Sequence, residues 1–319
     1  MNNLPNDQLN KNYDDEIDLR ELFHVLRAKI FYIGAITSIF SLISIMYALM
    51  LPNIFQSQAM MMPMEGDDGM QGMLGQYSGM ASLAGISLPS ESGSKAQEAI
   101  ARIKSFEFFS NYFLPQIKLE NLMVVKKWDQ ASNTLIYNES TFNSESSKWV
   151  KKVSSPKSSI PSSQEAYKKY QTIMNIAEDK KTSFITLSVE HESPFVAQQW
   201  VEIIMDQIDQ VMRDQDRQTA RKSIEYLNSL VPTVNYGEIK QALSSLQQEQ
   251  MKRLMMVEAS NNYIFKVLDS PIVPEVKVKP KRLLIVILGS MLGMMLTVLG
   301  VLVSHYTKKS SQDDEPGLR

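Results

Sequence analysis

Cysteine is absent from this 319-residue sequence, and histidine occurs only three times. The absence of cysteine fits an oxidising compartment in which no disulfide is formed. His24, His191 and His305 are scattered along the chain, and no cluster of His, Asp and Glu has the spacing of a metal site. We therefore predict that the protein is not an enzyme and holds no metal or cofactor.

The sequence also has no excess of basic charge and no phosphate-binding glycine motif. Between Pro52 and Arg282 it contains 26 basic and 26 acidic residues, so nucleic acid is not expected to be a partner. Six of the thirteen glycines lie between Gly66 and Gly85, but they form no G-x-G-x-x-G, and no Lys-Ser or Lys-Thr follows them. This stretch is predicted to be a flexible loop rich in Met and Ser.

Two stretches have no charged residue at all. Ile30–Leu51 and Leu283–Val303 are each long enough to cross about 30 Å of hydrocarbon as a helix, and neither shows a polar face. The first is too long for the apolar part of a signal peptide, and no clear cleavage site follows it. A buried core helix is the alternative interpretation, but we predict two transmembrane helices.

Two spans put both ends of the chain on one side of the membrane. We predict a cytoplasmic tail (1–29), transmembrane helices (30–51 and 283–303), one extracytoplasmic domain (52–282) and a second cytoplasmic tail (304–319). Basic residues near the membrane are almost balanced between the two sides. Because long loops are translocated largely regardless of their charge, the basic residues of the tails decide this orientation.

Residue patterns predict a mixed α/β domain. Phe55–Met62 and Phe184–Glu190 are typical of strands, and a helix is expected from Ser162. Ser193 is expected to cap a long helix that starts at Pro194. If this helix runs to Leu230 without a break, its length is on the order of 55 Å, so it cannot all lie on one small core.

The long helix is expected to turn near Pro232, which cannot occupy an undisturbed helix interior, and to return as a second helix within residues 194–260. Its face through Trp200, Ile204 and Ile208 is predicted to pack on the base of the domain. Three carboxylates share another face, Glu202, Asp206 and Asp209, and a solvated helix surface explains them more simply than catalysis.

Two polar regions complete the local analysis. Residues 128–163 are rich in Ser, Asn and Lys and are expected to form an exposed excursion. Before the first span, apolar residues between Leu19 and Ile30 recur at helical spacing, and Asp18 is placed to cap the helix. This helix either lies on lipid or contacts a partner.

The segment before the second span, residues 271–282, combines prolines with basic residues: Pro271, Pro274, Pro280, Lys279, Lys281 and Arg282. The prolines favour a stiff, extended connection that couples the domain to the span. The last three cations are expected at the level of the lipid headgroups.

Small residues recur inside both spans. Gly289 and Gly293 form a G-x-x-x-G in the second span, and the first span contains Gly34 and several serines. Such spacing allows close contact between helices in lipid. We predict that these glycines pack within or between subunits.

The order of these segments resembles the Wzz-type chain-length determinants, or polysaccharide co-polymerases. The resemblance rests on DDEIDLREL before the first span, SSQEAYKKYQ, HESPFVAQQWV at the start of the long helix, and YIFKVLDSPIVPEVKVKPKR before the second span. The chain departs from the kinase-fused branch, because neither a Walker-type motif nor a tyrosine cluster follows the second span.

The resemblance implies a ring-forming inner-membrane protein of Gram-negative bacteria, with a periplasmic α/β (α+β) base and long protruding helices. Such a protein sets the chain length of a polysaccharide, commonly lipopolysaccharide O-antigen, without catalysis. The implied partners are other copies of the chain, the membrane, a separate polymerase and the growing lipid-linked polysaccharide.

Two other functions stay open at this point. One is a component for export of capsule or exopolysaccharide that works with a separate kinase and an outer-membrane channel. The other is a two-span sensor of a periplasmic ligand, which would need a cytoplasmic output domain that the short tails do not contain.

Overall fold

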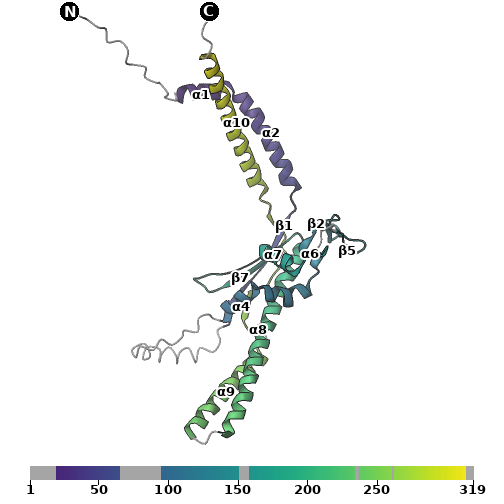
Figure 1. Ribbon diagram of the computed structural model, residues 1–319, viewed down its shortest axis with the longest axis vertical. Helices are drawn as coiled ribbons and strands as arrows, with labels where there is room; N and C mark the ends of the chain where they lie inside the picture. The colour runs from purple at the N-terminus through teal and green to yellow at the C-terminus, as the bar shows by residue number, and fades with distance from the viewer. Residues whose placement is uncertain (1–18, 65–94, 151–157, 234–236, 261, 314–319) are drawn as a thin grey trace, which may run out of the picture. The chain divides into compact units, whose positions relative to one another are not determined.

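The computed structural model describes residues 19–64, 95–150, 158–233, 237–260 and 262–313 (Figure 1). The chain forms two units, one from Pro52 to Lys279 and one from the segments that flank this range. The predicted glycine-rich loop and the predicted cap at Asp18 lie outside the described residues.

The larger unit is built on a five-stranded antiparallel sheet with the order β6-β7-β1-β8, in which β9 also pairs with β1. Its strands are β1 Ile54–Pro63, β6 Met174–Glu178, β7 Ile185–His191, β8 Phe265–Asp269 and β9 Lys277–Lys279. The strands expected at Phe55–Met62 and Phe184–Glu190 are confirmed as β1 and β7, and they pair with each other at the centre of the sheet. In β1, Ser57, Ala59 and Met61 are buried while the residues between them are more exposed, as the two-residue period of a strand requires.

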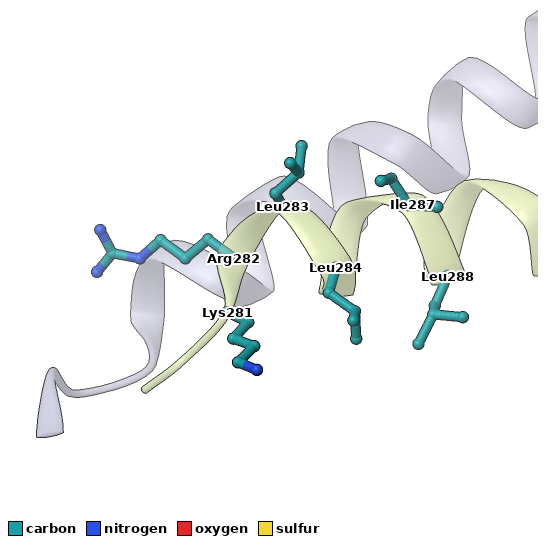
Figure 2. Close-up of a pocket in the computed structure, with 6 residues that line it drawn as sticks. All are labelled: Lys281, Arg282, Leu283, Leu284, Ile287 and Leu288. Carbon is teal, nitrogen blue, oxygen red and sulfur yellow. The ribbon is translucent and has the colours of Figure 1, made fainter. Parts of the chain in front are cut away.

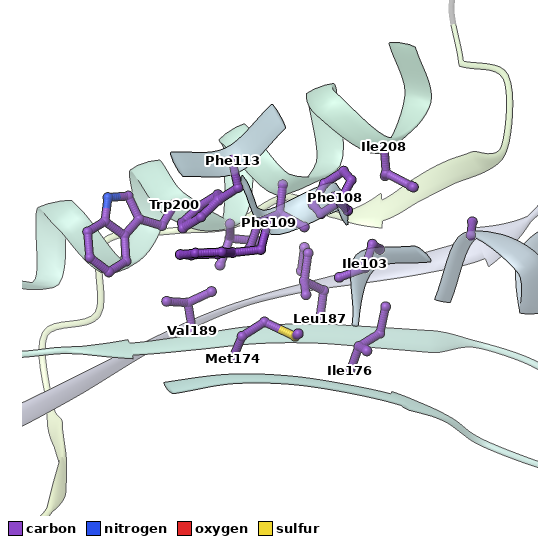
Figure 3. Close-up of a cluster of buried hydrophobic side chains, with 14 of the residues drawn as sticks. Ile103, Phe108, Phe109, Phe113, Met174, Ile176, Leu187, Val189, Trp200 and Ile208 are labelled. Atoms are coloured by element: carbon purple, nitrogen blue, oxygen red, sulfur yellow. The ribbon is translucent and has the colours of Figure 1, made fainter. Parts of the chain in front are cut away.

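Helices cover the buried face of the sheet. They are α4 Lys95–Ile103, α5 Phe106–Phe108, the π-helical turn η1 Phe109–Phe113, the 3-10 turn η2 Leu114–Gln116, α7 Ser163–Ile173 and the first half of α8 Pro194–Leu230. Figure 3 shows their aromatic and aliphatic side chains over β7 and β6. Phe113 lies edge-on to Trp200, with ring centroids 5.8 Å apart. The only polar atom of the buried Tyr170 side chain donates a hydrogen bond to the Ile103 carbonyl, at 3.0 Å.

The two predicted helix starts differ in their capping. Ser162 accepts a hydrogen bond from the Glu165 amide, and the Glu165 carboxylate accepts one from the Ser162 amide, so α7 opens with a capping box. Ser193 occupies the cap position of α8, but its side chain makes no capping bond. Its amide donates instead to Nδ1 of His191, at 2.9 Å. The predicted capping role of the Ser193 side chain is therefore wrong.

The long helix and its return are confirmed. α8 runs without a break from Pro194 to Leu230, η3 Val231–Thr233 follows, and α9 Gly237–Ala259 lies beside α8 (Figure 1). Beyond Met212, only Ala220 and Leu227 of α8 are buried. The far half of this helical hairpin thus contributes almost nothing to the core of its own domain.

The polar segment 128–163, predicted to be an exposed excursion, contains more regular secondary structure than the sequence indicated. After the short helix α6 Leu119–Met123, two small hairpins form, and their strands are β2 Val125–Asp129, β3 Thr134–Tyr137, β4 Phe142–Asn143 and β5 Lys148–Trp149. Phe142 explains why the second hairpin holds together. Its buried ring contacts Tyr137 and Trp149, with centroids 5.4 and 5.3 Å away.

The smaller unit consists of α1 Leu19–Ala28, α2 Ile30–Met50 and α10 Arg282–Asp313. α10 continues beyond the predicted end of the apolar run at Val303. Most apolar side chains of α2 and α10 are exposed, including Phe31 at 91 %. A core helix would bury such side chains, whereas α2 and α10 leave most of theirs exposed in this chain. Both helices meet the length and hydropathy of a membrane span.

Candidate functional sites

The two apolar helices pack in antiparallel fashion through the glycines of α10. Gly289 lies opposite Ser44, and an added Cβ at Gly289 would come within 2.7 Å of the Ser44 Cβ. Gly293 lies opposite Phe40, and its added Cβ would lie 2.5 Å from the Phe40 Cβ. Since real side-chain contacts are longer, only glycine permits this approach. The G-x-x-x-G of the sequence is thus occupied by α2 of the same chain.

Gly34 is placed differently. A Cβ added there would meet no atom within 4 Å, and the residue is exposed on α2. The structure therefore does not bring Gly34 into the contact between α2 and α10. A role for Gly34 in contacts between subunits remains a prediction.

Two of the three predicted headgroup cations lie at the start of the second apolar helix: Lys281 directly precedes α10, and Arg282 is its first residue. Figure 2 shows Lys281 and Arg282 beside an open hollow whose other lining residues are leucines and Ile287. Arg282 Nε donates to the Ala48 carbonyl of α2, at 3.2 Å. This bond satisfies a carbonyl at the end of α2, where the helix has no internal donor to offer. Arg282 therefore connects the two helices as well as carrying charge.

The proline segment is attached to the sheet by hydrogen bonds. Gln198 Nε2 donates to the Pro271 carbonyl at 3.2 Å, and Ser57 Oγ donates to the Ile272 carbonyl at 2.8 Å. Pro271 is buried, Pro274 is half-buried, and β9 then pairs with the start of β1. The chain is thus held extended by pairing with the sheet in addition to the stiffness of its prolines.

Lys279 has a partner within the protein, and its predicted position at the lipid headgroups remains a prediction. Its Nζ lies 2.6 Å from a carboxylate oxygen of Glu190 in β7. The charge of Lys279 is therefore engaged by the protein. Pro280 begins the other unit, where its carbonyl accepts a bond from the Arg282 amide at 3.0 Å.

The predicted packing face of α8 lies in the core. Trp200, Ile204 and Ile208 are each almost fully buried. His191, also buried, lies edge-on to Trp200 with centroids 4.8 Å apart, and its Nε2 is 3.0 Å from the Asn121 carbonyl. Burial lowers the pKa of His191 below its usual range, which favours the neutral ring. The neutral ring accepts at Nδ1 and donates at Nε2, so both nitrogens are satisfied.

One of the carboxylates interpreted as a solvated face has a different role. Asp209 Oδ1 accepts hydrogen bonds from the amides of Tyr263 and Ile264, at 2.7 and 3.2 Å, and its Oδ2 pairs with Arg213 at 2.7 Å. Arg213 also donates to the carbonyls of Val257 and Ser260 at the end of α9. The sequence interpretation is wrong for Asp209, because the carboxylate anchors the chain where it leaves α9.

A second polar cluster extends this anchor to α4. Lys95 Nζ lies 2.5 Å from Asp216 Oδ2 and 2.8 Å from the Tyr263 hydroxyl, which itself donates to Asp216 at 2.5 Å. Burial and the Asp216 carboxylate raise the pKa of Tyr263, so its hydroxyl keeps its proton. Sequence analysis missed this cluster. The only available signal was the spacing of charged residues on one side of α8, which does not identify partners that lie far away in the chain.

Charged pairs also join the two arms of the helical hairpin. Arg217 and Arg221 of α8 both reach Glu258 of α9, at 2.8 and 3.4 Å. The guanidinium groups lower the pKa of Glu258, with the hydrogen bond from Arg217 as the main cause. Among the described residues, no three His, Cys, Asp or Glu side chains gather as metal ligands. The polar clusters of this domain are thus connections between elements.

The fold and these sites define a class of protein: an α/β domain with a helical hairpin, carried between two apolar helices of membrane-spanning length. Comparison of the sequence with family models adds the family. Residues 15–113 match the family described as "Chain length determinant protein" (Wzz), and residues 237–306 match the one described as "G-rich domain on putative tyrosine kinase" (GNVR). The chain thus contains a Wzz chain-length determinant domain, as the resemblance of the sequence suggested, together with a GNVR domain.

Solved structures that match this chain include two of polysaccharide co-polymerases. A full-length bacterial polysaccharide co-polymerase is 16 % identical and has a TM-score of 0.39, covering 92 % of this chain and 99 % of its own. A fragment of WzzB from Salmonella Typhimurium is 13 % identical and has a TM-score of 0.30, covering 71 % and 100 %. No curated protein matches the chain in sequence.

Proposed function

We propose that this protein is a polysaccharide co-polymerase of the bacterial inner membrane that regulates the chain length of lipopolysaccharide O-antigen. Its main domain lies in the periplasm and both tails lie in the cytoplasm. It acts without catalysis, as a homo-oligomeric ring around the growing lipid-linked polysaccharide or its polymerase. The match of residues 15–113 to the chain-length determinant family carries this proposal.

The helical hairpin supports the oligomeric part of the proposal. Its far half buries few residues within the chain, and α9 exposes Leu246, Met251 and Met255. A second copy around a closed ring would cover such a surface repeatedly with the same contacts.

The proposed function is tested by the lipopolysaccharide banding profile of a strain that lacks the gene, beside the same strain complemented with it. A modal cluster of chain lengths should disappear on deletion and return on complementation, while polymer is still made. An unchanged ladder in both strains would show that the protein does not control O-antigen length.

The orientation has its own test, because the chain contains no cysteine. Single cysteines at exposed positions in the domain, such as Ser132, should react with a membrane-impermeant maleimide in cells with a permeabilised outer membrane. A cysteine in the C-terminal tail should react only after lysis. The reverse pattern would overturn the periplasmic placement.

We propose that Pro271, Pro274 and Pro280 transmit the orientation of the domain to the second span. Replacing Pro274, which is only half-buried, by Gly should shift the modal chain length while the protein level stays unchanged. Replacing the exposed Ser270 by Gly in the same segment is the matched control and should leave the profile as in the wild type.

A second candidate function is the export of capsule or exopolysaccharide with a separate kinase and an outer-membrane channel. The match of residues 237–306 to a domain described on a putative tyrosine kinase favours it. In that case deletion should change the yield or size of capsule or exopolysaccharide and leave the O-antigen ladder intact.

A further inference from the structure

A groove lies between the two apolar helices at the end where α2 begins. The groove has a volume of about 440 Å³, within the range of pockets that hold small molecules, and it is lined by residues of both helices. Its walls include Ile36, Phe40, Leu296 and Val301. A groove of this volume with apolar walls suits a hydrocarbon chain.

Gly300 faces open space in the groove. It lies in the groove wall, and a Cβ added there would meet no atom within 4 Å. At Gly289 and Gly293, in contrast, side chains of α2 fill the space that the missing Cβ leaves. The close contact of the two helices is therefore not continued at Gly300.

The mouth of the groove is cationic. Lys29 lines it, is exposed, and makes no ion pair with any described residue. The other polar groups of the lining are the hydroxyls of Tyr32, Thr297 and Ser304, and no carboxylate lines the groove. A free ammonium and hydroxyl groups beside an apolar channel complement a molecule with an anionic head and a hydrocarbon tail.

A second copy of the chain fits this site less well. Neither Ile30–Met50 nor residues 283–303 contain an acidic residue, so the spans of a neighbouring copy offer no charge to Lys29. Filling the groove with such a span would bury the ammonium without a partner, which is costly in hydrocarbon. Charge complementarity favours a lipid.

We propose that this groove binds one anionic phospholipid, whose phosphate lies at Lys29 and Tyr32 and whose acyl chain lies along Phe40, Leu296 and Gly300. The inference rests on the part of the proposed function that places α2 and α10 in the membrane. The bound lipid fills the gap between the helices at the headgroup level of one leaflet.

The test uses the full-length protein in a non-ionic detergent, titrated with phosphatidylglycerol and, separately, with phosphatidylcholine. Native mass spectrometry counts the lipids bound per protomer. The wild type should retain phosphatidylglycerol and release phosphatidylcholine. Lys29→Gln should lower the apparent affinity for phosphatidylglycerol about fivefold, the loss expected for one lysine at an anionic lipid surface.

Two matched controls separate the groove from general effects. Arg27→Gln removes the same charge two residues away from the groove lining, and Gly34→Leu adds the same side chain as Gly300→Leu at another open glycine of the membrane pair. Gly300→Leu should reduce bound phosphatidylglycerol to less than roughly half, and both controls should bind as the wild type does. Equal binding by all four variants would overturn the proposal, as would equal retention of both lipids.

A further measurement decides between lipid and a second copy. In a chain without cysteine, Gly300→Cys introduces a single thiol in the groove. Efficient disulfide formation between two copies in native membranes would show a protein neighbour at Gly300 and overturn the proposal. A lack of cross-linking together with retained phosphatidylglycerol supports it.

Failure of this inference can be distinguished from failure of the proposed function. A lost modal cluster on deletion combined with no selective lipid binding would leave chain-length control intact and remove the lipid site. Selective lipid binding combined with an unchanged lipopolysaccharide ladder would support the lipid site and refute chain-length control.

Discussion

Removal of the Asp209 carboxylate should destabilise the domain far more than removal of a neighbouring carboxylate on the same helix. Asp209 accepts hydrogen bonds from the amides of Tyr263 and Ile264, where the chain leaves α9 and enters β8. In Asp209→Ala both amides lose their acceptor, and Arg213 loses its ion pair. The connection between the helical hairpin and the sheet should loosen first.

The size of the effect follows from the hydrogen bonds. A hydrogen bond to a charged group contributes about 1.5 kcal/mol or more to stability, so the two amide bonds predict a loss of about 3 kcal/mol. For a domain of this size each kcal/mol shifts the melting temperature by about 2–4 °C, so the melting temperature should fall by roughly 6–12 °C. Asp209→Asn keeps an acceptor oxygen without the charge, so its melting temperature should lie between those of the wild type and Asp209→Ala.

Tryptophan fluorescence is the appropriate assay. All three tryptophans, Trp128, Trp149 and Trp200, lie in the larger unit, so the signal from detergent-solubilised protein reports the unfolding of that unit. Asp214→Ala is the control, because Asp214 is 59 % exposed and its ion pair is with Arg217 of the same helix rather than with the chain that follows α9. Equal melting temperatures for the two alanine variants would refute the anchoring role of Asp209.

Three further results are expected. Gly289→Leu combined with Gly293→Leu should separate the two membrane helices and alter oligomer stability or modal chain length, whereas Gly34→Leu should leave the packing of the two helices within the chain intact. Wild-type behaviour of the double variant on size-exclusion chromatography and on the lipopolysaccharide gel would contradict the packing role. Because burial lowers the pKa of His191, the unfolded state binds more protons, and the domain should lose stability as the pH falls below about 6.5. His191→Gln should weaken this dependence in melts recorded from pH 5 to 8, and an unchanged slope would exclude His191 as its source. Trp200→Ala should cost about 3–5 kcal/mol, measured by urea unfolding, and a loss below 1 kcal/mol would show that the aromatic core repacks around the gap.

Local residue patterns predicted several strands and helices of the larger unit. Residue types indicated the strand β1, alternation of side chains indicated β7, and the pattern from Ser162 indicated the helix α7. The hairpin at Phe142 could not be anticipated, because the polar residues around it are typical of loops. There, one buried aromatic ring outweighs the local composition.

The absence of charge over about twenty residues was enough to recognise α2 and α10, since helix length and hydropathy are properties of a continuous segment. The recurrence of apolar residues likewise showed a long helix and its return. Contacts between distant segments were not accessible in this way. Gly34 and Gly289 have similar surroundings in the sequence, yet only Gly289 is covered by another helix. Asp209 gains its role from Tyr263, 54 residues further along the chain. Spacing shows which residues share a face, whereas folding determines what that face meets.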